Sequence, residues 1–164
     1  MKIEKFNSSV LRKKCEEIGE ITDEIKDIVV DMAQTMEKNQ GIGLAAPQVG
    51  ISKRIVVVQA DWEGGRILAL VNPKIIKRSQ EKQITEEGCL SFPGIFIKIK
   101  RAKSVTVKGL NIKGEEIEFK ADGIAATVFQ HEIDHLNGTL FFQRLNFFKK
   151  ILFKLKHPLL RVWI

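Results

Sequence analysis

Two histidines four residues apart, in the segment 131–135 (HEIDH), constrain this chain more than any other feature. On a helix, positions i and i+4 lie on one face, so His131 and His135 can bind one metal ion together. Glu132 is rotated about 100° round such a helix, close enough to contact a water on that ion without being a ligand. Glu132 is therefore a candidate general base. The alternative is a solvated helix that carries two histidines by chance.

The helix that carries this segment is expected to run from residue 122 to about residue 138. Gly138 favours the left-handed conformation that commonly ends a helix. Three side chains lie at helical spacing before His131 and on its face, namely Ile124, Thr127 and Val128. They either form an apolar pocket beside the ion or belong to the ordinary core.

The rest of the chain predicts one further helix and then several strands. Apolar residues at helical spacing predict an amphipathic helix over residues 23–38, with Thr22 or Asp23 as its N-cap. Residues 39–50, rich in glycine and proline, are expected to form a shaped loop. Six short runs predict strands, at 54–60, 67–71, 75–78, 95–100, 104–110 and 115–120. Turn signals at 63–65, 72–73 and 113–114 indicate antiparallel hairpins.

The size and composition are those of one globular domain. A chain of 164 residues that is 44% hydrophobic and 29% charged can bury a core. The formal charge of +7 favours anionic surfaces such as nucleic acid or lipid headgroups, but it identifies no partner. The first residues do not resemble a secretory signal. No stretch of the sequence approaches the roughly 20 apolar residues of a membrane span. A content of two cysteines is typical of proteins in a reducing compartment. We therefore expect a cytoplasmic protein with no stable membrane insertion.

Two imidazoles do not complete a zinc-type site, which normally has three protein ligands and one open position. Cys89 lies in the glycine-flanked segment 86–94, which we expect to be a loop between strands that brings the sulfur close to the ion. Left uncoordinated, Cys89 would be a small buried hydrophobe. Cys15 has no such context and is assigned to the core, and His157 is assigned a solvated or capping role. Cys89 is the stronger candidate for the third ligand.

Three segments together resemble one family, the bacterial-type peptide deformylases. They are residues 41–48 (GIGLAAPQ), 87–91 (EGCLS) and 131–135 (HEIDH), in the order and spacing of the family. The resemblance implies an α+β single domain, with antiparallel or mixed β-sheets around a central HExxH-bearing helix, an N-terminal amphipathic helix and a C-terminal helix. We expect residues 1–146 to form the catalytic domain and residues 147–164 to be a basic amphipathic helix and tail of the same domain.

The resemblance also implies a reaction, removal of the formyl group from the N-terminal formylmethionine of nascent polypeptides with release of formate. The implied metal ligands are Cys89, His131 and His135. Glu132 would be the general acid and base on a metal-bound water. The Gln48 amide and the backbone N–H of Leu90 would contact the formyl oxygen and stabilise the oxyanion. Without the resemblance, Gln48 would be interpreted as a turn residue that bonds its own loop.

The metal and the activity each have alternatives. Ligation by one cysteine and two histidines alone indicates zinc, whereas the resemblance implies ferrous iron with zinc or nickel tolerated. We expect one divalent metal, Fe(II) first, with Zn(II) or Ni(II) as the alternatives. Two other functions stay open, a general HExxH metallopeptidase and a non-catalytic metal- or RNA-binding module that only the basic charge favours.

Further residues are predicted to bind an N-formylmethionyl peptide. The bare backbone of Gly43 and Gly88 would approach an extended peptide as a neighbouring strand does, although either glycine could serve only a turn. The side chains predicted to line the substrate site are Ile42, Phe96, Ile124, Thr127 and Val128.

Three polar positions around the site are open to interpretation. Glu87 and Asp134 either orient histidine and arginine side chains, as metal sites usually require, or are solvated carboxylates. Gln40 stands where the family commonly has an acidic residue, which would leave Arg101 without a charge partner.

Residues 147–156 predict a basic amphipathic helix. One face carries Phe147, Phe148, Ile151, Leu152 and Leu155, and Lys149, Lys150, Lys154 and Lys156 lie largely opposite. Such a helix packs on its own domain, on a membrane surface or on a ribosomal surface rich in RNA phosphate. We expect packing on the domain. In the family that this chain resembles, a basic C-terminal helix can dock the enzyme near the nascent-chain exit, so the ribosome is a candidate partner, but residues 158–164 are more apolar than that role needs.

Overall fold

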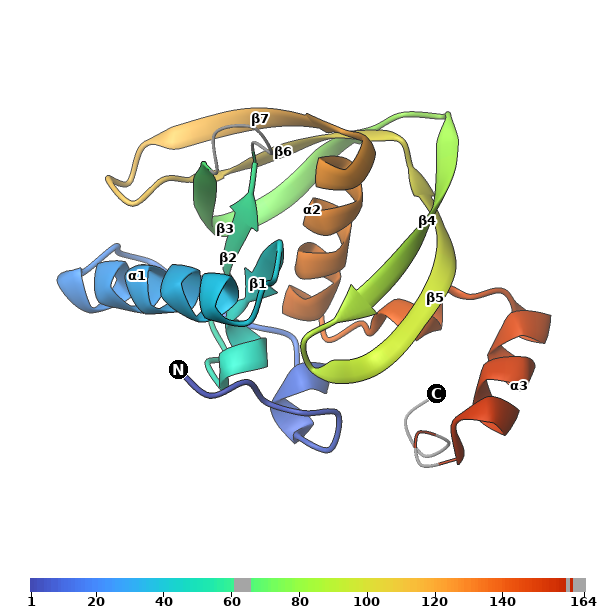
Figure 1. The fold of residues 1–164 in the computed structure, drawn as a ribbon. Coiled ribbons are helices and arrows are strands. Elements are labelled where there is room, and N and C mark those ends of the chain that lie inside the picture. Colours follow the sequence, from blue (N-terminus) through green and yellow to red (C-terminus); the bar gives the residue numbers. More distant parts are fainter. Residues whose placement is uncertain (61–65, 159, 161–164) are drawn as a thin grey trace.

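The computed structural model describes residues 1–60, 66–158 and 160, which form one α+β domain (Figure 1). Its α-helices are α1 (Asp23–Lys38), α2 (Gly123–Leu136) and α3 (Phe147–Lys156). Its strands are β1 (Gly43–Ala45), β2 (Ile55–Gln59), β3 (Ile67–Arg78), β4 (Lys82–Cys89), β5 (Phe92–Ala102), β6 (Ser104–Leu110) and β7 (Glu116–Asp122). Short 3-10 helices are η1 (Ser9–Arg12), η2 (Ala46–Val49) and η3 (Phe141–Arg144).

The strands form two antiparallel sheets. The larger sheet has the order β1-β2-β3-β6-β7, and β4 and β5 form a separate hairpin. Figure 1 shows α2 between this hairpin and the larger sheet. Val56 and Val58 of β2 belong to the core cluster that contains α2, whereas Ile55 and Val57 belong to the cluster that contains α1. The strand β2 is buried on both faces, which explains its uninterrupted run of β-branched residues.

Helix α2 is buried on every side from Ala125 to Leu136. Its apolar residues, among them Ala126, Phe129 and Ile133, pack in the core against the larger sheet. Polar groups in a buried helix need partners, and Gln130 finds them on the backbone of Ala102, from whose N–H it accepts and to whose oxygen it donates. The histidines and acidic residues of α2 are therefore expected to be paired or to serve a site.

Local chemistry sets the start of α1 and the end of α2. Helix α1 spans the residues over which the apolar spacing predicts a helix, and Thr22 Oγ1 caps it by accepting from Ile25 N at 3.4 Å. Helix α2 ends before Asn137, and Gly138 follows with φ of 68°. A Cβ at Gly138 would lie 2.5 Å from the backbone oxygen of Arg12, so the chain also needs glycine there for close packing.

The turn predicted at Asn72-Pro73 is wrong. Residues 67–71 and 75–78 belong to one strand, β3, and the pair marks an irregularity where the register with β6 shifts between Val71 and Lys74. Asn72 has φ of 52°, and its side chain accepts from Ile18 N and donates to Ile18 O. These two bonds to a neighbouring segment stabilise a bulge where the dipeptide alone indicates a chain reversal.

The two loops predicted around the site contain strands. Residues 39–50 include β1 and η2, and residues 86–94 include the end of β4 and the start of β5. Cys89 is the last residue of β4 and pairs with Phe92, so a tight hairpin turn replaces the expected loop. The turn predicted at 63–65 lies outside the described residues.

The expectation that the apolar face of α3 packs on the domain is also wrong. Phe147, Phe148, Ile151, Leu152 and Leu155 are all exposed, and Phe153 is the buried residue of the helix. His157 is the C-cap of α3, in line with its predicted capping role. Among the described residues, no helix combines the length and the apolar character needed to cross a bilayer.

Candidate metal centre

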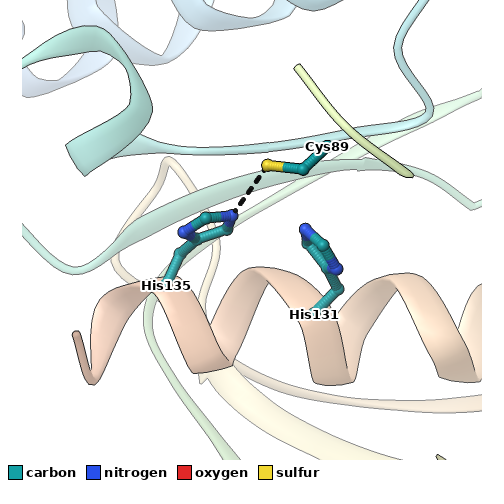
Figure 2. A group of neighbouring side chains, drawn as sticks. All are labelled: Cys89, His131 and His135. Atoms are coloured by element: carbon teal, nitrogen blue, oxygen red, sulfur yellow. Dashed lines mark hydrogen bonds between the residues drawn. The ribbon is translucent and has the colours of Figure 1, made fainter. Parts of the chain in front are cut away.

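Cys89, His131 and His135 come together where the end of β4 meets α2. Figure 2 shows the two imidazoles rising from successive turns of α2 toward the Cys89 sulfur at the end of β4. One ligand atom from each residue lies within 4.8 Å of the others, and Cys89 Sγ is 3.3 Å from His135 Nε2. A thiolate with two imidazoles suits a divalent transition metal. The three side chains therefore fit a metal centre, as the histidine spacing and Cys89 predicted.

Glu87 orients one of the two histidines. Its carboxylate oxygen Oε2 lies 2.9 Å from His131 Nδ1, which donates to it, so the other ring nitrogen is left for a metal. Burial opposes the ionised form of Glu87, but hydrogen bonds from Arg101 and His131 hold its pKa below the ordinary value. Glu87 is thus a buried ionised carboxylate and not a solvated one.

Arg101 has two acidic partners, so the prediction that it lacks one is wrong. It donates to both oxygens of Glu87, at 2.7 Å and 2.9 Å, and to Asp134 Oδ2 at 2.6 Å. Asp134 also pairs with Arg144. Glu87 and Asp134 supply the charge that Gln40 does not.

The two histidines differ electrostatically. Burial, with the charges of His131 and Arg101, lowers the pKa of His135 well below its ordinary value, so this ring is neutral. Burial also lowers the pKa of His131, but its hydrogen bonds to Cys89 and Glu87 outweigh burial and raise that pKa well above the ordinary value. A metal ion that binds His131 therefore displaces a proton.

Glu132 is the acidic residue of the site that lacks a complete set of partners. It is 4% exposed, and its Oε2 is a buried atom without a hydrogen-bond partner among the described residues. Burial raises the pKa of Glu132 to about 7. A carboxyl group with a pKa near neutrality can both accept and return a proton.

Gln48 is held so that its amide nitrogen faces the sulfur. Its Oε1 accepts from Ala45 N at 2.7 Å, and its Nε2 lies 3.4 Å from Cys89 Sγ. The bond of Gln48 to its own loop is therefore present, and it turns the Nε2 end toward Cys89. Leu90 directly follows Cys89 in the turn between β4 and β5.

The predicted substrate residues divide into a buried and an exposed group. Gly43 packs directly against α2, since a Cβ there would lie 2.5 Å from Val128 Cγ1 and 2.6 Å from Glu132 Oε1. Gly88 lies under the ring of Phe96, with a Cβ position 2.6 Å from Phe96 Cε1. Three of the predicted side chains are exposed, namely Ile42 at 39%, Phe96 at 65% and Ile124 at 56%.

Thr127 belongs to a polar network that the sequence analysis missed. Its hydroxyl lies 3.0 Å from Gln83 Nε2 and 3.2 Å from Thr85 Oγ1, both on β4. The sequence pattern that indicates this network is the alternation of residues 83, 85, 87 and 89, which share one face of a strand. The sequence analysis predicted no strand over these residues and therefore no network.

A buried HExxH helix joined by a cysteine from a neighbouring strand defines a class, the metal-dependent hydrolases. Sequence comparison narrows this class. The polypeptide deformylase family profile matches residues 1–150. The peptide deformylase of Halothermothrix orenii is 49% identical over 145 residues, which cover 88% of this chain and 93% of that protein. The chain belongs to the polypeptide deformylase family.

Solved structures of peptide deformylases share the fold. Arabidopsis thaliana peptide deformylase 1B, in complex with an inhibitor, has a TM-score of 0.91 at 36% identity and covers 98% of this chain and 90% of its own. The Acinetobacter baumannii enzyme with Met-Ala-Ser bound has a TM-score of 0.82 at 34% identity, with coverage of 88% and 98%. The chain is therefore a hydrolase of a family that implies a divalent metal, and Cys89, His131 and His135 offer its ligands.

Replacing Glu87 with glutamine is expected to lower both the affinity for the metal and the stability of the fold. Glutamine keeps the shape but loses the charge that Arg101 and His131 share, so metal affinity should fall roughly 10- to 100-fold. The free energy of unfolding should fall by about 2 kcal/mol. Competition with a chelator measures the first quantity and urea unfolding the second. The control is Glu86→Gln, an exposed neighbour on β4; equal effects of the two variants would contradict the role of Glu87.

A comparison of the wild type with Glu87→Gln at different pH values tests the pKa of Glu87. Because this pKa is lower in the folded protein than its ordinary 4.5, the ionised carboxylate stabilises the fold above that pH. The contribution is lost as the pH falls through the lower folded value. The stability difference between wild type and Glu87→Gln should therefore shrink in acid, and a difference that grows in acid would contradict the assignment.

Proposed function

We propose that this protein removes the formyl group from the N-terminal formylmethionine of nascent polypeptides and releases formate. The observation that carries the proposal is the buried Glu132 carboxylate, which has an unpaired oxygen beside three metal-ligand side chains. Family membership supports the reaction class. The Met-Ala-Ser bound to the Acinetobacter baumannii relative is a peptide with N-terminal methionine, as the product of this reaction would be.

The proposed cofactor is one divalent metal, Fe(II) in first place and Zn(II) or Ni(II) as alternatives. Cys89, His131 and His135 would hold it, with His131 oriented by Glu87. When bound, such an ion lowers the pKa of a water toward 7 and polarises a carbonyl group.

The proposed role of Glu132 is proton transfer. Its carboxylate would take a proton from the attacking water and deliver it to the amine nitrogen that leaves. Burial suits it to both steps, because it brings the pKa of the group close to neutrality. The bare backbone of Gly43 leaves room for the carboxylate, since a Cβ at this position would lie 2.6 Å from Glu132 Oε1.

Gln48 and Leu90 are proposed to stabilise the oxyanion. The Gln48 amide is already turned toward Cys89 by its bond to Ala45, so little reorganisation is needed as charge develops on the formyl oxygen. The Leu90 N–H would be the second donor. A single donor of this kind can contribute about 3 kcal/mol to the transition state.

The substrate peptide is proposed to lie along the backbones of Gly43 and Gly88. Its methionine side chain would contact Val128 and Thr127, with the exposed Ile42, Phe96 and Ile124 at the rim. We further propose that residues 1–146 hold the catalytic machinery. A cytoplasmic location fits a substrate that leaves the ribosome and two cysteines that are both free. A general metallopeptidase is not favoured, since the matched relatives are peptide deformylases.

Glu132→Ala tests the proposed mechanism. Without the carboxylate, formate release from a formyl-Met peptide should fall by at least about 100-fold, since general acid and base catalysis contributes this much. The metal content should be unchanged because Glu132 is not a proposed ligand. The matched control is Glu118→Ala, an exposed glutamate of β7. Normal turnover by Glu132→Ala would show that the assigned mechanism is wrong.

Gly43→Ala tests whether the glycine positions Glu132. A methyl group there would overlap Val128 and Glu132, so the carboxylate must move. A displacement of about 1 Å can lower turnover by about 100-fold. Turnover and metal content are measured together, and Gly19→Ala, where a Cβ meets nothing within 4 Å, is the control. Unchanged turnover in Gly43→Ala would remove Gly43 from the site.

Metal analysis tests the proposed cofactor. Protein prepared without oxygen is expected to contain iron, in one equivalent per chain, and a Cys89→Ser variant is expected to contain less because the thiolate is lost. Stoichiometric zinc or nickel in place of iron would contradict the iron assignment. Unchanged metal content in Cys89→Ser would contradict the ligand set.

A further inference from the structure

The outward face of α3 is apolar. Phe147, Phe148, Ile151, Leu152 and Leu155 are 71%, 75%, 42%, 64% and 63% exposed. A helix at the surface of a globular protein normally turns its polar face to water and its apolar face to the core. Helix α3 instead buries Phe153 and turns its broader apolar face to water, and exposed apolar surface of this kind marks an interaction site.

Phe153 fixes this orientation. Its ring is buried, stacks on Phe142 of η3 at 5.4 Å and lies 4.5 Å from the ring of His157. At about 100° per residue, the five exposed apolar side chains span an arc of about 140°, centred roughly opposite Phe153. The helix cannot turn that arc toward the domain without withdrawing Phe153 from the core cluster that contains Leu140, Phe141 and Phe142.

Lysines border the apolar arc on both sides. On the same helical projection, Lys149 and Lys156 lie at one border and Lys150 and Lys154 at the other. The segment from Phe147 to Lys156 contains no Asp or Glu. The charge of this face therefore complements an anionic surface.

The order of side chains across the helix favours lipid over RNA. A helix in the plane of an anionic bilayer buries its apolar arc among the acyl chains, while lysines at the borders extend to the phosphates. A helix that binds RNA needs its basic residues where the surface is contacted. The centre of the outward arc of α3 holds Phe148, Ile151 and Leu155.

We propose that α3 is an interfacial helix that binds an anionic phospholipid surface. It lies in the plane of the headgroups with Phe148 and Leu152 inserted and with Lys149, Lys150 and Lys156 against lipid phosphates. This binding site is separate from the metal centre, and it places the enzyme at the membrane surface without a spanning helix.

Flotation with lipid vesicles tests the proposal on the full, metal-loaded chain. The wild type is expected to bind vesicles that contain phosphatidylglycerol and to bind phosphatidylcholine vesicles only weakly. Phe148→Gln/Leu152→Gln should weaken binding by more than about tenfold through lost apolar burial. Lys149→Glu/Lys156→Glu should weaken it by about 25-fold or more.

Two controls separate this surface from general effects. The variant Val30→Gln/Ile112→Gln removes two exposed apolar side chains that lie outside α3, with exposed fractions of 52% and 44%. This variant should bind vesicles like the wild type. All the variants should keep wild-type turnover of a small soluble substrate, because none of the residues belongs to the metal centre.

Four results would overturn the proposal. The first is that the wild type does not bind phosphatidylglycerol vesicles. The second is that Phe148→Gln/Leu152→Gln binds these vesicles as well as the wild type does. The third is sedimentation with ribosomes but not with vesicles, which would assign α3 to RNA. The fourth is a lipid-free dimer that Phe148→Gln/Leu152→Gln converts to a monomer while vesicles are not bound, which would assign the face to a second copy of the chain.

Discussion

The buried carboxylate of Glu87 is the interaction on which the rest of the site depends. It lies on β4 and binds Arg101 on β5 and His131 on α2, so it joins the hairpin to the helix. A buried ion pair stabilises only while every member keeps its partners, because an unpaired buried charge is strongly unfavourable. The hairpin cannot move away from α2 without breaking these bonds. This constraint also positions Cys89, two residues further along the same strand.

Strand β4 and helix α2 meet as two matching rows of side chains. The inner face of β4 carries Gln83, Thr85, Glu87 and Cys89, and the facing turns of α2 carry Thr127, His131 and His135. Two residues of a strand rise about 6.6 Å and four residues of a helix about 6.0 Å, so the two rows stay matched over a few steps. At one end of the rows, Thr127 forms a neutral hydrogen bond with Gln83. In the middle His131 pairs with Glu87, and at the other end His135 contacts the Cys89 sulfur. Thr127 is therefore part of a polar contact between β4 and α2, although periodicity alone assigned it to an apolar face.

Local patterns in the sequence predicted the parts of the structure that are decided locally. The spacing of apolar residues, a cap at Thr22 and a stop at Gly138 suffice for α1 and α2, because helix formation depends on near neighbours. Strand β4 was missed because its inner face is polar, and those side chains are tolerated only through partners on α2 and β5. The bulge at Asn72 depends on Ile18, which is far away in sequence. Periodicity also predicted the amphipathic character of α3, but not its orientation, which depends on Phe153 meeting Phe142.

The central claim is that this site hydrolyses a formyl amide and leaves peptide bonds intact. The most direct measurement is turnover of formyl-Met-Ala-Ser by the metal-loaded wild type, with formate, free N-termini and peptide fragments quantified together. We expect one formate for each Met-Ala-Ser released and no cleavage at Met-Ala or Ala-Ser. Cleavage of either peptide bond, or no formate from metal-loaded protein, would contradict the account.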